Sequence, residues 1–158
     1  MAEKILVMGL GNTLLTDDGI GPHVIAALGQ VSARRNTAQV ALIDGGTLGL
    51  SLLPEIEAAT ALIVVDAASF GGAPGEVRVF DEAAMDAQLG AAKTSAHALA
   101  LADLIGAATL SGCLPARRAL VGIAPKSVSW GLEPSPEVAA SIPLACEKIE
   151  GIIGRWEA

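Results

Sequence analysis

The chain has 158 residues, of which 52% are hydrophobic and only 3% aromatic, and its formal net charge is −7. This length fits one domain over residues 1–158, and apolar content drawn from aliphatic side chains is typical of a layered fold with buried strands. The acidic balance argues against nucleic acid, whose phosphates need clustered Lys and Arg, and no apolar run approaches the ~20 residues that span a bilayer, so we expect a cytoplasmic protein without a membrane partner.

Predicted strands and helices alternate through the first half of the chain. Lys4–Met8 is a short aliphatic run that ends in a glycine turn, which is typical of a buried strand. From Ile20 the apolar residues keep helical spacing, and Pro22 places the helix start close to Asp18, because proline is tolerated only in the first turn. Next come a predicted strand over Gln39–Ile43, a short helix over Leu50–Glu57 and a strand over Ala61–Val65.

The second half of the chain predicts a sheet edge and two longer helices. Glu76–Phe80 alternates polar and apolar residues, which indicates an edge strand with one solvated face, although its direction is not readable. A helix is expected over His97–Ala108, a strand over Arg118–Ala124 and a last helix over Glu137–Ile153. Because strands alternate with helices, we predict a single-domain α/β fold, a three-layer α/β/α sandwich with a mostly parallel five-stranded sheet.

Acidic residues follow the predicted strands at the places where ligands bind in open parallel sheets, outside the strands' carboxyl ends. Asp18 lies after the first strand, Asp44 ends the second and Asp66 follows the third. His97 begins a helix on the same side, where the positive end of the helix dipole favours the neutral imidazole that ligates metals. Asp18, Asp66 and His97 together offer the oxygen and nitrogen ligands that suit a divalent transition metal.

Each of these residues also has a simpler interpretation. Asp17 or Asp18 could cap a helix, Asp44 could belong to a strand-ending turn, and His97 could be a satisfied buried histidine. Asp66 directly follows an apolar run, where a carboxylate is poorly placed unless the strand opens onto a cleft. The glycine turn after the first strand also fits a dinucleotide-binding unit in part, but two carboxylates at the helix start would repel pyrophosphate.

Several motifs occur in a fixed order between about Ile5 and Ala145. They are MGLGNTLLTDDGIGP at Met8–Pro22, DGGT at Asp44–Thr47, LIVVDA at Leu62–Ala67, Pro74–Gly75, Ser95-x-His97, Gly122-Ile123-x-Pro125 and SPEV at Ser135–Val138. A set of separate motifs in this order is far more specific than any one glycine pattern. Together the motifs resemble the family of hydrogenase maturation proteases, which are endopeptidases.

This resemblance implies an enzyme that removes the C-terminal extension of a nickel-iron hydrogenase large-subunit precursor after nickel has been inserted. The precursor would be the partner, and the nickel, or another divalent transition metal, would arrive with the substrate. The family's metal site maps onto Asp18, Asp66 and His97. Asp18 and Asp66 are also the candidate catalytic residues, and the resemblance implies no further cofactor-binding residue.

Three mechanisms remain open at this stage. The three side chains could complete the coordination of nickel held by the precursor and so recognise it, a metal could polarise the carbonyl or activate water, or two carboxylates could share the acid and base roles of an aspartic protease. Two other functions also remain. A self-contained metallohydrolase of a small substrate would bind metal tightly by itself, and a nucleotide-binding module would bind NAD without catalysis.

Overall fold

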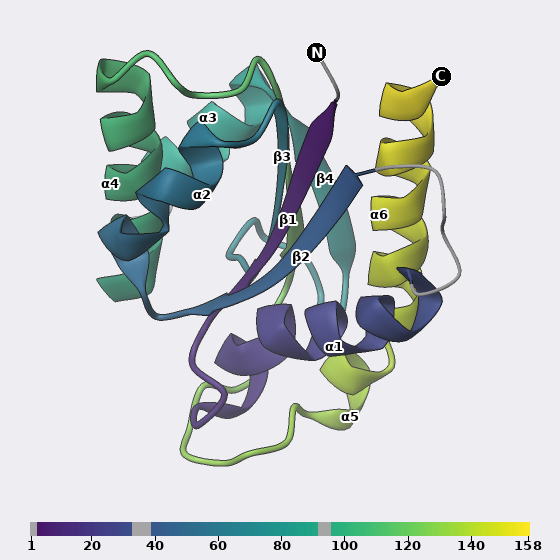
Figure 1. Ribbon diagram of the computed structural model, residues 1–158. Coiled ribbons are helices and arrows are strands. Elements are labelled where there is room, and N and C mark those ends of the chain that lie inside the picture. The colour runs from purple at the N-terminus through teal and green to yellow at the C-terminus, as the bar shows by residue number, and fades with distance from the viewer. Residues whose placement is uncertain (1–2, 33–38, 92–95) are drawn as a thin grey trace.

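Five strands form one sheet in the computed structural model, which describes residues 3–32, 39–91 and 96–158, apart from the side chains of 31, 32, 39, 91 and 96–100 (Figure 1). The strand order is β2-β1-β3-β5-β4. All neighbouring strands are parallel except β4 and β5, which are antiparallel. The bounds are β1 Lys4–Leu10, β2 Gln39–Gly46, β3 Ala61–Ala67, β4 Val77–Asp81 and β5 Arg117–Ile123.

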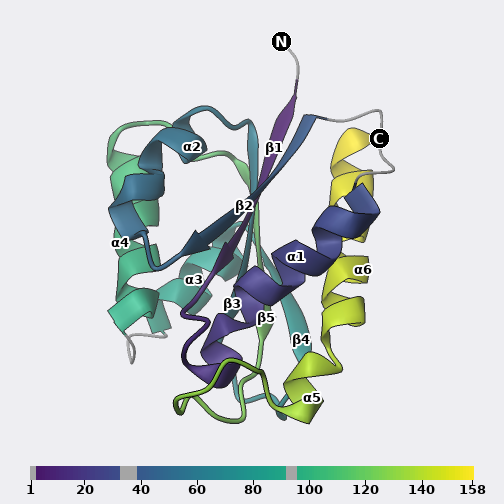
Figure 2. The ribbon, with the colours of Figure 1, turned by 60° about the horizontal axis from the view of Figure 1, so that its bottom comes forward.

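Helices cover both faces of this sheet, as Figures 1 and 2 show. One face packs against α1 (Ile20–Ser32) and α6 (Ile142–Glu157). The other face carries η2 (Gly49–Leu52), α2 (Leu53–Glu57), α3 (Ala83–Ala91) and α4 (Ala96–Leu110), and two short helices, η1 (Thr16–Gly19) and α5 (Pro136–Ala139), precede α1 and α6. The predicted α/β/α sandwich with a mostly parallel five-stranded sheet is therefore confirmed. Among the described residues, no helix has the length and apolar character needed to cross a membrane.

Two apolar clusters fill the spaces between the sheet and its helices. Successive side chains of a strand point to opposite faces, so a central strand covered on both sides must be apolar throughout. This is why β1 and β3 read as unbroken aliphatic runs and not as alternating ones. Ile5, Val7, Ile63 and Val65 face α1 and α6, whereas Leu6, Met8, Leu62 and Val64 face α2, α3 and α4.

The structure differs from the sequence prediction at two helices. The sequence predicts no element over Ala83–Ala91. Among the described side chains of α3 only Met85 and Leu89 are buried, so the apolar pattern is weak. The single helix predicted over Glu137–Ile153 is two helices, α5 and α6. A continuous helix would place Pro143 in its interior, where the ring clashes with the carbonyl four residues earlier, so a new helix starts at Ile142 instead.

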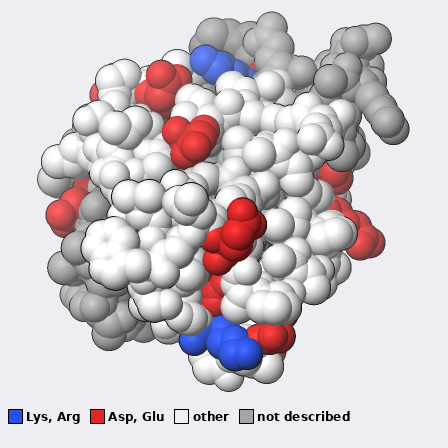
Figure 3. All heavy atoms as spheres, turned by 90° about the horizontal axis from the view of Figure 1, so that it is seen from below, with Lys and Arg blue, Asp and Glu red and all other residues white. Residues whose placement is uncertain are grey.

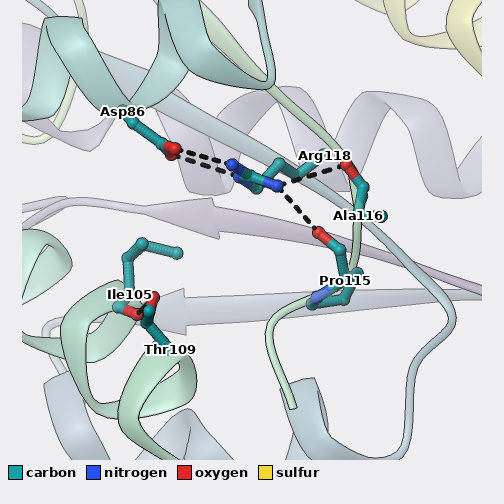
Figure 4. Close-up of polar contacts among 6 residues, drawn as sticks. All are labelled: Asp86, Ile105, Thr109, Pro115, Ala116 and Arg118. Carbon is teal, nitrogen blue, oxygen red and sulfur yellow. Dashed lines mark hydrogen bonds and ion pairs between the residues drawn. The ribbon is translucent and has the colours of Figure 1, made fainter. Parts of the chain in front are cut away.

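Arg118 holds α3 against the first residues of β5 (Figure 4). Its guanidinium donates to both carboxylate oxygens of Asp86, with Nη2 2.6 Å from Oδ2 and Nε 3.1 Å from Oδ1. The Nη1 atom donates to the carbonyl oxygens of Pro115 and Ala116, each at 3.2 Å. Planar two-point contacts of this kind fix geometry better than a single ion pair. These contacts lie at the amino end of β5. The loops of the candidate site lie at the opposite, carboxyl end of the strands.

Candidate functional site at the sheet switch point

The winding of the sheet reverses between β1 and β3. The chain passes from β1 to β2 on one side, and it later crosses to β3 on the other side of β1. Loops that leave two such strands in opposite directions open a crevice at the carboxyl ends, which is the usual ligand site of this architecture. Asp18 follows β1 and Asp66 lies near the end of β3, so the structure brings both predicted residues to this one switch point.

Pairing between the strands shows how close the two segments lie. Gly9 of β1 is the register partner of Val65, the residue before Asp66. The helix η1, which contains Asp18, contacts β3 directly. The two carboxylates therefore come from neighbouring strands and from segments that touch.

Two glycines allow this contact. A Cβ atom at Gly21 would lie 2.6 Å from the carbonyl oxygen of Val65, so the first turn of α1 rests on the end of β3. Gly11 has φ +131°, and a Cβ there would collide with the carbonyl oxygen of Asp18. Only glycine fits a positive φ and so close a backbone approach. The glycine pattern after β1 thus packs the corner between η1 and α1 onto the strand ends, and it does not form a phosphate-binding loop.

Asp18 is almost fully buried, with 7% of its surface exposed. Its Oδ2 accepts a hydrogen bond of 2.9 Å from the backbone N–H of Asn12, in the turn that follows β1. The N-cap of η1 is Leu15, which makes no side-chain cap bond. The interpretation of Asp17 or Asp18 as the cap of the helix that begins near Ile20 stays a prediction. The hydrogen bond from Asn12 fixes the Asp18 carboxylate against the turn at the switch point.

Asp66 is also buried, with 4% of its surface exposed. It is paired in register with Gly122 of β5, which places it inside the sheet and not in a loop beyond it. Burial of a carboxylate costs several kcal/mol unless charge or hydrogen bonds compensate it. Two buried carboxylates at one switch point favour either a bound cation or a shared proton. Asp18 and Asp66 can therefore act chemically as cation ligands or as an acid–base pair.

His97 is the second residue of α4, and its side chain lies outside the described part of the structure. One turn further on, Leu101 lines a small pocket together with Leu10 and Gly46, so the first turns of α4 lie at the carboxyl ends of the strands. Among the side chains that the structure does describe, no three His, Cys, Asp or Glu gather into a metal centre. The participation of His97 stays a prediction.

Asp44 lies near the end of β2, and its side chain forms a local turn. It is exposed, and its Oδ1 accepts a hydrogen bond of 3.0 Å from the N–H of Gly46. This is the local side-chain turn that aspartate commonly makes after a strand. This contact agrees with the interpretation of Asp44 as part of a strand-ending turn.

Asp17 is the residue that sequence reasoning undervalued. It is fully buried, and its carboxylate accepts hydrogen bonds from the N–H groups of Lys126 (2.8 Å), Ser127 (2.9 Å) and Ser135 (2.6 Å) and from the Ser135 hydroxyl. These contacts fasten η1 to the segment 126–135, more than 100 residues away. No local sequence pattern predicts that Asp17 binds this segment. The only related motif is Ser135-Pro136, which contains one of its partners. Asp17 thus holds segment 126–135 against η1, whereas the carboxylate of Asp18 is bound to the turn after β1.

The ionisation of Asp17 links this clasp to pH. Burial raises the pKa of the Asp17 carboxyl, but the hydrogen bonds from Ser127, Ser135 and Lys126 lower it by more, so the pKa of Asp17 lies below its ordinary value. A lowered folded-state pKa stabilises the fold fully above the unfolded pKa of about 3.9, and this contribution is lost as the pH falls through the folded-state value.

We therefore expect the stability difference between the wild-type protein and an Asp17→Asn variant to shrink as the pH falls below about 4. Urea unfolding of both proteins at pH 7 and at a series of acidic pH values measures this difference. A difference that stays constant down to the lowest pH at which both proteins fold would contradict the assignment of Asp17 as an ionised clasp.

Similarity to known proteins extends over nearly the whole chain. A family model described as hydrogenase maturation protease matches residues 22–152. The hydrogenase expression/formation protein HupD of Rhodobacter capsulatus is 37% identical over 155 residues, which cover 98% of this chain and 73% of that protein. The hydrogenase 2 maturation protease of Escherichia coli is 37% identical over 147 residues, which cover 92% of this chain and 88% of the relative.

Solved structures give the same result. The hydrogenase maturating endopeptidase HybD from E. coli superposes with a TM-score of 0.83 at 36% identity, covering 92% of this chain and 89% of the other. The [NiFe] hydrogenase maturation protease HybD from Thermococcus kodakarensis superposes with a TM-score of 0.78 at 28% identity, covering 94% and 98% of the two chains. The segments that carry Asp66 and residues 126–135 lie within the range that the family model matches.

Proposed function

The chain belongs to the hydrogenase maturation protease family, and on this premise we propose that it removes the C-terminal extension of a nickel-iron hydrogenase large-subunit precursor after nickel insertion. Membership of the family makes the chain a peptidase. The observation that carries the more specific proposal is the placement of Asp18 and Asp66, two buried carboxylates, at the switch point of the sheet. A site built in this way suits a cation more than a neutral peptide.

We propose that the carboxylates recognise the precursor through the nickel that it carries. Asp18 and Asp66 would supply oxygen ligands and His97 a nitrogen ligand to metal already bound by the precursor. Carboxylates bind a cation through their negative charge, so a positively charged centre in the substrate would strengthen its binding at this site. Affinity therefore depends on the charge that the substrate brings. A nickel-free precursor lacks this charge and should bind weakly.

The proton transfers of hydrolysis require a base near the attacking water. A carboxylate at the switch point can accept the proton if it lies within hydrogen-bond reach of that water. In the aspartic-type alternative the same two residues share one proton and exchange acid and base roles. That alternative predicts cleavage without metal and a bell-shaped pH profile that belongs to the pair. Metal dependence thus separates the two mechanisms.

The test of the proposed function uses a nickel-loaded large-subunit precursor and catalytic amounts of the protein. We expect the precursor to lose its C-terminal extension as one discrete mass change, seen by intact-protein mass spectrometry. A precursor whose mass stays unchanged after prolonged incubation would overturn the proposal. Tight metal binding with turnover of small substrates would favour a self-contained metallohydrolase, and a fluorescence response to NAD would favour a nucleotide-binding module.

A further inference from the structure

Exposed apolar side chains gather on two segments beside the candidate site. Leu14 is 49% exposed, Val128 56%, Trp130 81% and Leu132 65%. Leu14 lies in the turn between β1 and η1, and the other three lie in the loop between β5 and α5. We call these four side chains the apolar rim. Figures 1 and 2 show the two segments side by side below the carboxyl ends of the strands.

The backbone beneath the apolar rim is firmly held. Gly131 donates from its N–H to the carbonyl oxygen of Leu14 at 2.9 Å and accepts from the N–H of Thr16 at 2.9 Å, which forms a parallel bridge between the segments. The carbonyl oxygen of Ser127 accepts from the N–H of Asp17 at 3.1 Å and from the Thr16 hydroxyl at 2.7 Å. Ser127 and Gly131 therefore fix this loop to the segment that carries Leu14, and the exposed Val128, Trp130 and Leu132 lie beside these two anchored positions.

The backbone contacts at Ser127 and Gly131 hold the loop in place, so the exposure of Val128, Trp130 and Leu132 is built into the loop. A large exposed indole next to a reaction site is the type of side chain that anchors interfaces. The loop thus presents a preformed row of contacts at little entropic cost to a partner.

We propose that the apolar rim binds an extended apolar segment of the hydrogenase large-subunit precursor, close to the bond that is cut. This inference rests on the proposed function. Continuity with the site supports it, because the rim residue Leu14 and the site residue Asp18 belong to one turn and its following helix. The same Asp17 carboxylate fastens both segments.

Charge favours an apolar partner over an acidic one. Lys126, the cation nearest in sequence to Trp130, is already paired with Glu137, with Nζ 2.8 Å from Oε2. Glu133 follows Leu132 and is exposed, so the loop also carries a negative charge beside the rim. Figure 3 views the molecule from the side of the strand ends and shows a largely uncharged face with separate patches of Asp and Glu.

The size of the apolar rim fits a peptide segment better than a second copy of the chain. The apolar rim has four side chains, whereas each side of a stable interface typically has about 20–30 residues. Each partner of a stable dimer buries about 800 Å². The rim alone is too small for a dimer, whereas an extended segment of a substrate that is also held at the switch point needs no larger surface.

Replacing Trp130 with Ala tests the apolar rim. We expect KM for the nickel-loaded precursor to rise roughly 10- to 30-fold, the effect of losing an interface anchor, with kcat nearly unchanged at saturation. Leu110→Ala is the matched control, because Leu110 is 92% exposed at the end of α4, away from the strands' carboxyl ends. Both variants should unfold at the same urea concentration as the wild-type protein.

A spectroscopic measurement makes the test independent of turnover. In a Trp156→Phe background, Trp130 is the only tryptophan, and its emission should shift to the blue when precursor covers it. A wild-type protein that does not trim the precursor would remove the proposed function itself. The proposal for the apolar rim alone would be overturned if the wild-type protein trims the precursor but Trp130→Ala keeps the wild-type KM and the Trp130 emission does not shift to the blue. Trp130-dependent self-association in sedimentation experiments would also overturn it, since the occupant would be a second copy.

Discussion

Replacing Asp66 with Asn should lower kcat/KM for trimming by roughly 10³-fold while leaving the fold intact. Asn has nearly the same shape as Asp but removes the negative charge that the site offers to a cation or a proton. The Asp66 side chain is buried, with 4% of its surface exposed, and the nearly isosteric Asn fills the same space. We therefore expect a folded protein with lost activity, the combination typical of a functional residue. Mass-spectrometric rates and urea unfolding measure the two effects.

The control is the same chemical change at an exposed carboxylate. Asp103 lies on the solvent side of α4, so Asp103→Asn should trim within about threefold of the wild-type rate, as expected for a surface substitution. Asp18→Asn should resemble Asp66→Asn. Retention of more than a tenth of wild-type kcat/KM by Asp66→Asn would remove this carboxylate from the mechanism.

Replacing Asp17 with Ala should destabilise the protein by about 3 kcal/mol and reduce trimming as well. The substitution leaves the N–H groups of Lys126, Ser127 and Ser135 without their acceptor in a partly buried position. Each hydrogen bond to a charged group contributes about 1.5–3 kcal/mol, and part of the loss is recovered when the loop relaxes into water. Since segment 126–135 also carries Trp130, KM should rise along with the loss of stability.

Ser135→Ala provides the comparison for this prediction. It removes the hydroxyl contact to Asp17 but keeps the three backbone donors, so we expect a cost of only about 1 kcal/mol. Denaturant unfolding at pH 7 gives both values. An Asp17→Ala protein within 0.5 kcal/mol of the wild type would show that the clasp adds nothing measurable, a magnitude typical of ordinary surface substitutions.

The sheet could be predicted from sequence because its signal is local. The central strands are covered on both faces, so β1 and β3 are unbroken apolar runs that end at glycine or aspartate. The antiparallel direction of β4 could not be read, because it depends on the long-range pairing of Val79 with Val121. The helix α3 could not be predicted because, of its described side chains, only Met85 and Leu89 reach the core.

The candidate site was only partly predictable for a related reason. The ends of adjacent parallel strands meet, so the positions of Asp18 and Asp66 follow from topology. The different contacts of Asp17 and Asp18 do not follow from topology. Neighbouring residues of a tight helical turn point in different directions, and the partners of Asp17 come from a loop more than 100 residues later. The family resemblance supplied the role of His97, which remains a prediction.

The most direct test of the account compares nickel-loaded and nickel-free forms of the same large-subunit precursor under identical conditions. Because Asp18 and Asp66 are proposed to recognise the charge that nickel brings, we expect only the nickel-loaded form to lose its C-terminal extension, measured as a change in intact mass. Equal trimming of both forms would contradict it.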